Sequence, residues 1–209
     1  MISAHEALDR LKQGNDRFTA DLHGHDAITC QTRQGKLGGE QEPFAVILGC
    51  SDSRVPVEIV FDQCLGDLFV IRVAGNIVAS TQIGSVEFAA EKFGTRLVVV
   101  LGHSRCGAVL ATIDEIERPS ESPSPNSLSI VNRILPSVLP LLDQGRELDH
   151  DELVRRAVRA NIRTSVEQLR HGSGILEGLV RDSGLRIVGA EYSLETGEVE
   201  FFDAEMAAT

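Results

Sequence analysis

The sequence lacks several features that define whole classes of protein. It has no apolar run near the roughly 18 residues that a membrane helix needs, so we expect no membrane partner. Basic residues are outnumbered by acidic ones, 20 to 31, and the formal net charge is −11. Nucleic acids select basic surfaces, so a nucleic-acid partner is not expected. The N-terminus has no basic segment followed by an apolar one, which favours a cytoplasmic protein without a secretory signal.

Cysteine is also scarce. The four cysteines include no Cys-x-x-Cys pair and form no dense framework. In a chain without a signal, reduced thiols and metal ligation are expected rather than disulfides. The pattern indicates no partner for Cys30 or Cys64.

The apolar residues come in short, nearly unbroken runs rich in β-branched side chains. Such runs are typical of strands buried on both faces, and the helix-like segments between them predict parallel pairing through helical crossovers. At 209 residues the chain is long enough for one well-buried domain and short for two. The predicted strands are 45–48, 68–73, 97–101, 186–192 and 199–202, with a turn at 195–197 before the last.

We therefore predict a single α/β domain over residues 1–209, with a central, mostly parallel sheet flanked by helices. An N-terminal helical arm is expected at 1–30, where Ser3 and Glu6 have the spacing of a capping box. The predicted helices are 3–20, 83–93, 106–117, 127–143, 150–171 and 173–182.

Two cysteines and one histidine lie where strands are predicted to end. Cys50 follows the run at 44–48, and His103 and Cys106 follow the run at 97–101. Ligands gather at the carboxyl ends of strands in parallel sheets, so these side chains are expected to meet. Two thiolates and an imidazole with an open fourth position are a recognised catalytic zinc set.

A carboxylate and a guanidinium follow directly after Cys50. Alternate side chains of an extended segment share a side, which would direct Cys50, Asp52 and Arg54 together. Asp52 has two possible roles. It either fills the fourth zinc position, or it pairs with Arg54, whose planar cation matches a carboxylate, and leaves room for water.

Plainer interpretations explain these residues less fully. A single cysteine is most often a small buried hydrophobe, but two cysteines, a histidine and an Asp–Arg pair at one edge are not explained in that way. A structural zinc site normally has four Cys or His ligands, and no fourth one has suitable spacing. Residues 102–106 resemble a serine nucleophile elbow, but Cys106 replaces its second glycine.

The segments Cys-Ser-Asp-Ser-Arg-Val-Pro at 50–56 and His-Ser-Arg-Cys-Gly-Ala at 103–108 together resemble the β-class carbonic anhydrases. The resemblance continues through 69–76 and 84–88 and extends over essentially the whole chain. It implies reversible hydration of CO₂ to bicarbonate and a proton by a zinc-bound hydroxide. It also implies one Zn²⁺ per subunit, held by the residues Cys50, His103 and Cys106, with Asp52 either as fourth ligand or bonded to Arg54.

The resemblance further implies a substrate site and an oligomer. Gln41, nine residues before Cys50, would donate a hydrogen bond to bicarbonate, and the backbone N–H of Gly107 would face the same site. Members of the family dimerise, often further to tetramers, so a homodimer or larger homo-oligomer is expected, with residues 1–30 packed on a partner. An apolar CO₂ pocket, contributed partly by a neighbouring subunit, would include Phe69, Ala74 and Phe88.

Two other functions fit the same scaffold. The site could hydrolyse carbonyl sulfide or carbon disulfide, because a linear heterocumulene would meet the same zinc-bound hydroxide. The chain could also be a zinc-stabilised, non-catalytic subunit that senses bicarbonate or serves as a scaffold. The intact Asp52–Arg54 pair and Gln41 favour catalysis of CO₂ hydration.

Overall fold

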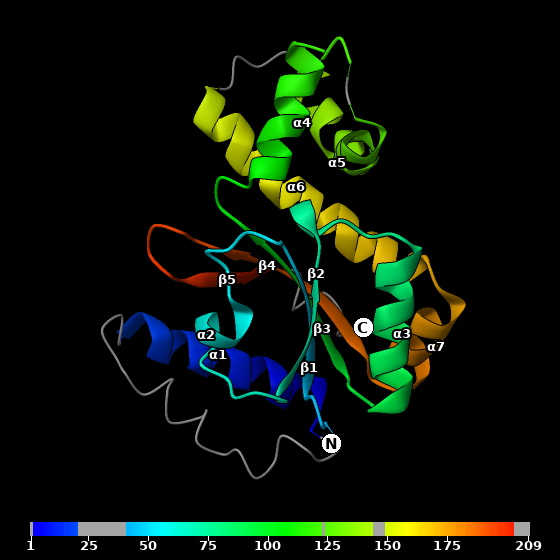
Figure 1. The fold of residues 1–209 in the computed structure, drawn as a ribbon. Coiled ribbons are helices and arrows are strands. Elements are labelled where there is room, and N and C mark those ends of the chain that lie inside the picture. The colour runs from blue at the N-terminus through cyan, green and yellow to red at the C-terminus, as the bar shows by residue number, and fades with distance from the viewer. Residues whose placement is uncertain (1, 21–40, 123, 144–148, 203–209) are drawn as a thin grey trace.

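Within the described residues (2–20, 41–122, 124–143 and 149–202), five strands form one sheet in the order β2-β1-β3-β4-β5 (Figure 1). The structure is a computed structural model. The first four strands in this order pair in parallel, and β5 pairs antiparallel with β4, which confirms the predicted, mostly parallel sheet. The strands are β1 Ala45–Gly49, β2 Leu68–Arg72, β3 Leu97–His103, β4 Arg186–Tyr192 and β5 Val199–Phe202.

Helices cover both faces of the sheet, and the strands are apolar because both of their faces are buried. Side chains alternate along β1: Val46 and Leu48 face a core shared with α3 to α7, whereas Ala45 and Ile47 face a core shared with α1 and α2. Every residue of β1 and β3 is buried. The helices are α1 Ala4–Ala20, α2 Val57–Val60, α3 Ser80–Lys92, α4 Gly107–Glu117, α5 Pro125–Asp143, α6 His150–His171 and α7 Gly174–Asp182, with a short 3₁₀ helix, η3, at Ala74–Asn76.

The first helix packs on its own chain. Its capping box is present, because the Glu6 N–H donates to Ser3 Oγ at 3.2 Å and the Ser3 N–H donates to a Glu6 carboxylate oxygen at 3.1 Å. Leu8 and Leu11 are buried against the sheet. Packing of residues 1–30 on a partner stays a prediction, and residues 21–30 lie outside the described ranges.

One expectation about the cysteines is wrong. Cys64 is disulfide-bonded, whereas the sequence predicted reduced thiols. Cys50 and Cys106 are free thiols, as expected. Cys30 lies outside the described residues. In the part of the chain that the structure describes, no helix has both the length and the apolar character to cross a membrane.

Two helical glycines should respond oppositely to alanine. A Cβ at Gly14 of α1 would lie 1.9 Å from the carbonyl oxygen of Phe61, so Gly14→Ala should push α1 off the residues after α2 and cost about 1–3 kcal/mol. A Cβ at Gly178 of α7 would meet nothing within 4 Å, so Gly178→Ala should stabilise by about 0.4–1 kcal/mol. Urea unfolding measures both, and equal effects of the two substitutions would contradict this packing of α1.

Candidate metal centre

The thiols of Cys50 and Cys106 meet the imidazole of His103 at the carboxyl edge of β1 and β3. Cys50 directly follows β1, His103 ends β3, and Cys106 is the residue before α4. These residues lie close together because the parallel pairing of β1 with β3 places Gly49 opposite Leu101. The three ligand atoms lie within 4.8 Å of one another, and the two sulfur atoms are 4.0 Å apart. All three side chains are buried, so the predicted meeting of these residues is confirmed.

The histidine presents a free nitrogen to the sulfur atoms. Nδ1 of His103 lies 3.0 Å from the carbonyl oxygen of Ser104, which assigns the ring proton to Nδ1 as the donor. Nε2 is buried and has no hydrogen-bond partner; among the described residues only Asn76 Nδ2 shares this condition. A buried polar atom without a partner is rare because it costs free energy. A cation among the three ligand atoms would satisfy Nε2.

The two thiols are hydrogen-bonded to each other. This bond lowers the pKa of Cys50 to about 3, against the effect of burial, and the Gly75 N–H assists at 3.3 Å from the sulfur. The same S–H···S bond, together with burial and the charge on Cys50, raises the pKa of Cys106. A divalent cation would bind both sulfurs as thiolates and release their protons, which is the expected coupling of thiol ionisation to metal binding.

Helix α6 holds the turn that donates to Cys50. Gly75 and Asn76 have φ values of 70° and 44°, in the left-handed region. The buried Asn161 side chain donates to the Gly75 carbonyl at 2.8 Å, and the buried Ser165 hydroxyl donates to the Asn76 carbonyl at 3.0 Å. A Cβ at Gly75 would come within 2.8 Å of a side-chain carbon on α5, so this position requires glycine. Sequence reasoning missed both α6 residues because no motif contains them.

Asp52 is engaged by Arg54. One carboxylate oxygen accepts the Arg54 backbone N–H at 2.9 Å and Nε at 3.0 Å, and the other accepts Nη2 at 2.8 Å. The prediction of an extended segment is wrong: a tight turn, closed by a bond from the Val55 N–H to the Asp52 carbonyl, brings the two side chains together.

The arginine keeps the carboxylate ionised. Its hydrogen bonds hold the pKa of Asp52 well below the usual range. Oδ2 of Asp52 lies 3.8 Å from His103 Nε2, beside the ligand cluster but outside it. Of the two roles that the sequence leaves open for Asp52, this structure contains the pairing with Arg54.

The carbonic anhydrase family model matches residues 45–199, which include every residue of this cluster. The chain belongs to the carbonic anhydrase family. It is 40% identical to the carbonic anhydrase of Mycolicibacterium smegmatis over 197 residues, covering 93% of this chain and 91% of that relative. Carbonic anhydrase 2 of Mycobacterium tuberculosis is 38% identical over 197 residues, covering 94% of this chain and 92% of the relative.

The chain shares its fold with solved β-carbonic anhydrases, the class that the resemblance predicted. A crystal structure from a study of two tetrameric β-carbonic anhydrases of Sordaria macrospora superposes with a TM-score of 0.74. It covers 95% of this chain and 96% of its own, at 21% sequence identity.

Two of the five residues that the family resemblance assigned to substrate lie beside the cluster. Gly107 begins α4 directly after Cys106. Ala74 precedes Gly75, whose N–H donates to the Cys50 sulfur. Both predicted positions therefore lie next to a predicted zinc ligand in the same subunit.

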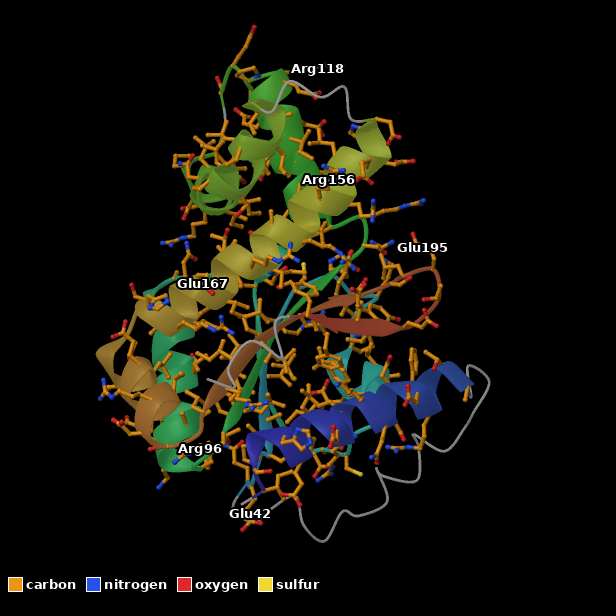
Figure 2. All side chains as sticks on the ribbon, turned by 180° about the vertical axis from the view of Figure 1, so that it is seen from behind. Glu42, Arg96, Arg118, Arg156, Glu167 and Glu195 are labelled. Carbon is orange, nitrogen blue, oxygen red and sulfur yellow. The ribbon has the colours of Figure 1, made fainter. Side chains whose placement is uncertain are left out.

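The other three lie elsewhere in the subunit. Gln41 precedes β1 and Cys50 follows it, so the five-residue strand, about 16 Å long at about 3.3 Å per residue, separates them. Figure 2 shows Glu42, the neighbour of Gln41, at the end of the sheet opposite to Glu195. Phe69 of β2 lies opposite Val46 of β1 in the sheet. Val46 is four residues before Cys50, so Phe69 also lies away from the end of β1 that carries Cys50.

An aromatic cluster accounts for the two phenylalanines. The Phe69 ring lies 6.2 Å from that of Phe88 and 6.0 Å from that of Phe93, and the last two pack edge to face at 5.5 Å. Phe88 is 51% exposed. Within one subunit, Gln41, Phe69 and Phe88 therefore lie away from Cys50. Their place in a substrate site, which the resemblance shares partly with a neighbouring subunit, stays a prediction.

The contacts from α6 predict a cost for removing Asn161. Asn161→Ala leaves the buried Gly75 carbonyl without a partner, and we expect a loss of about 1–3 kcal/mol in the free energy of unfolding of the metal-free protein. Asn126→Ala, at an exposed position of α5, is the control and should change it by less than about 0.5 kcal/mol. Equal stabilities of the two variants in urea would show that α6 does not hold the turn.

Proposed function

We propose that this chain is a zinc enzyme that catalyses the reversible hydration of CO₂ to bicarbonate and a proton. The observation that carries the proposal is the buried Cys50–His103–Cys106 cluster beside a carboxylate that is already committed to Arg54. Relatives that match nearly the whole chain at 38–40% identity are named carbonic anhydrases, which supports the same activity here.

Cys50, His103 and Cys106 would hold the metal. The donor set fits zinc, because two sulfurs and an imidazole nitrogen with one open position form a recognised catalytic set, and because the orphaned Nε2 needs a partner. When bound, zinc acts as a Lewis acid that makes a water molecule nucleophilic near neutral pH. The pairing of Asp52 with Arg54 keeps the fourth position available.

Asp52 would orient the nucleophile. Its Oδ2, beside His103 Nε2, would accept a hydrogen bond from the attacking water and direct a lone pair of that water toward CO₂. Because Arg54 keeps the pKa of Asp52 low, the carboxylate accepts hydrogen bonds and does not donate them. Ala74 would contribute apolar surface to the CO₂ site, and the Gly107 N–H would bind an oxygen of bicarbonate.

We propose that the active form is a homodimer or a larger homo-oligomer. Tetrameric β-carbonic anhydrases of Sordaria macrospora have this fold. Gln41, Phe69 and Phe88 lie away from the cysteines of their own subunit, so they would complete the substrate site of a neighbour. Sedimentation of the purified protein tests this, and an active monomer would contradict it. The cytoplasmic location stays a prediction from the sequence.

Replacing the carboxylate should separate metal binding from catalysis. Asp52→Asn should retain one zinc per chain and lower the rate of CO₂ hydration by about 100-fold or more, because an amide holds the water less well and loses the Arg54 pairing. Asp114→Asn, at an exposed position of α4, is the control. Stopped-flow hydration with a pH indicator measures the rate, and elemental analysis measures zinc.

The wild-type protein tests the reaction itself. Zinc-loaded protein that does not hydrate CO₂ at any pH would contradict the proposal and favour a non-catalytic subunit. Faster turnover of carbonyl sulfide than of CO₂ in parallel assays would identify the alternative hydrolase. An Asp52→Asn variant with wild-type activity would leave the zinc site in place but remove the proposed role of Asp52.

A further inference from the structure

Ser104 directly follows His103, and each of its polar groups takes part in a hydrogen bond. Its N–H donates to the Tyr192 carbonyl at 2.9 Å. Its hydroxyl donates to a Glu195 carboxylate oxygen at 2.7 Å and accepts the Leu194 N–H at 3.0 Å. Its carbonyl accepts Nδ1 of His103 at 3.0 Å. The orientation of the imidazole is thus tied to the segment between β4 and β5.

The Glu195 carboxylate contacts both Ser104 and Arg105. These two residues separate His103 from Cys106. One carboxylate oxygen accepts the Ser104 hydroxyl, and the other lies 3.3 Å from Nε of Arg105. Arg105 has a φ of 53°, a left-handed conformation that a side chain other than glycine adopts at a cost. Figure 2 shows Glu195 on the hairpin turn between β4 and β5, which no sequence motif connects to the metal ligands.

We propose that Glu195, acting through Ser104, is a positioning residue for the metal ligand His103. This inference rests on the proposed zinc site. A metal-bound histidine usually donates its second ring N–H to an outer partner that fixes the tautomer and the ring orientation, and here that partner is the Ser104 carbonyl. The carbonyl cannot shift without loss of the bonds that the hydroxyl makes to the hairpin. The hairpin therefore sets where Nε2 points.

The hairpin has bonds of its own besides those of this carboxylate, which accepts the Ser193 hydroxyl at 3.4 Å. Its turn is closed by bonds from the Gly197 N–H to the Ser193 carbonyl at 2.9 Å and from the Thr196 N–H to the Ser193 hydroxyl at 3.0 Å. The Glu195 side chain is 49% exposed. Removal of this carboxylate should therefore disturb the turn at 103–106 more than the fold.

Zinc affinity is the first measurement, by competition with a chromophoric chelator. Ser104→Ala and Glu195→Ala should each weaken zinc binding by about 10-fold or more, the range seen when an outer partner of a ligand is removed. Ser104→Thr retains the hydroxyl and should stay within about 3-fold of wild type. Thr196→Val, in the same hairpin, is the matched control and should bind zinc as the wild type does, because the Thr196 hydroxyl bonds to Glu198 and not to Ser104.

A second measurement separates positioning from a general structural role. The metal-free variants should unfold close to the metal-free wild type, and the added stability on zinc binding should be smaller, because weaker binding stabilises less. The visible spectrum of the cobalt-substituted protein should change in Ser104→Ala and not in Thr196→Val. A purely structural role would instead lower the metal-free and zinc-bound stabilities equally and leave zinc affinity unchanged.

The outcomes distinguish this inference from the proposed function. If the wild-type protein binds no zinc, the proposed function and this inference both fail. If the wild type binds zinc and Glu195→Ala binds it equally well, only this inference is overturned. Equal weakening in Thr196→Val would also overturn it, because the effect would then belong to the whole hairpin.

Discussion

Two sulfur atoms lie 4.0 Å apart in the interior of this protein, at the edge of a parallel sheet. These two buried thiols are in contact, and they lie next to an imidazole nitrogen without a hydrogen-bond partner. Burial of an unpaired polar atom is costly. A divalent cation bound among the three side chains would remove this cost. The arrangement around the site is understood most simply as support for that ion.

Each ligand is held by a different part of the chain. The turn at Gly75, fixed by α6, donates to Cys50. The hairpin after β4 fixes the carbonyl that orients His103. Cys106 is fixed as the N-cap residue directly before α4. The parallel sheet sets the spacing of these parts, because β1 and β3 are neighbours and end at the same edge.

The layout of the sheet and the meeting of the three candidate ligands could be predicted from the sequence for physical reasons. Strands buried on both faces need continuous apolar runs, and the predicted strands 186–192 and 199–202 coincide with the observed ones. The ligands follow such runs, and strand ends meet in a parallel sheet. The short α2 and η3 were not predicted, because neither has the length over which helical periodicity becomes visible.

The supporting contacts could not be predicted in this way. Asn161 and Glu195 act on turns far from them in sequence, and a polar residue on a helix or in a hairpin is usually solvated. The role of Gln41 in a substrate site stays a prediction, because a pattern shared with a family does not say which subunit uses the residue. The disulfide of Cys64 was missed because spacing alone does not reveal the distance between two thiols.

X-ray absorption at the zinc edge, on protein purified under reducing conditions, tests whether Cys50, His103 and Cys106 hold the metal. We predict one zinc per chain with two sulfur neighbours at about 2.3 Å and nitrogen or oxygen neighbours at about 2.0–2.1 Å. Both sulfur neighbours should be lost when Cys50 and Cys106 are replaced together by serine. Protein without metal, or zinc bound with any other number of sulfurs, would contradict the proposed zinc site.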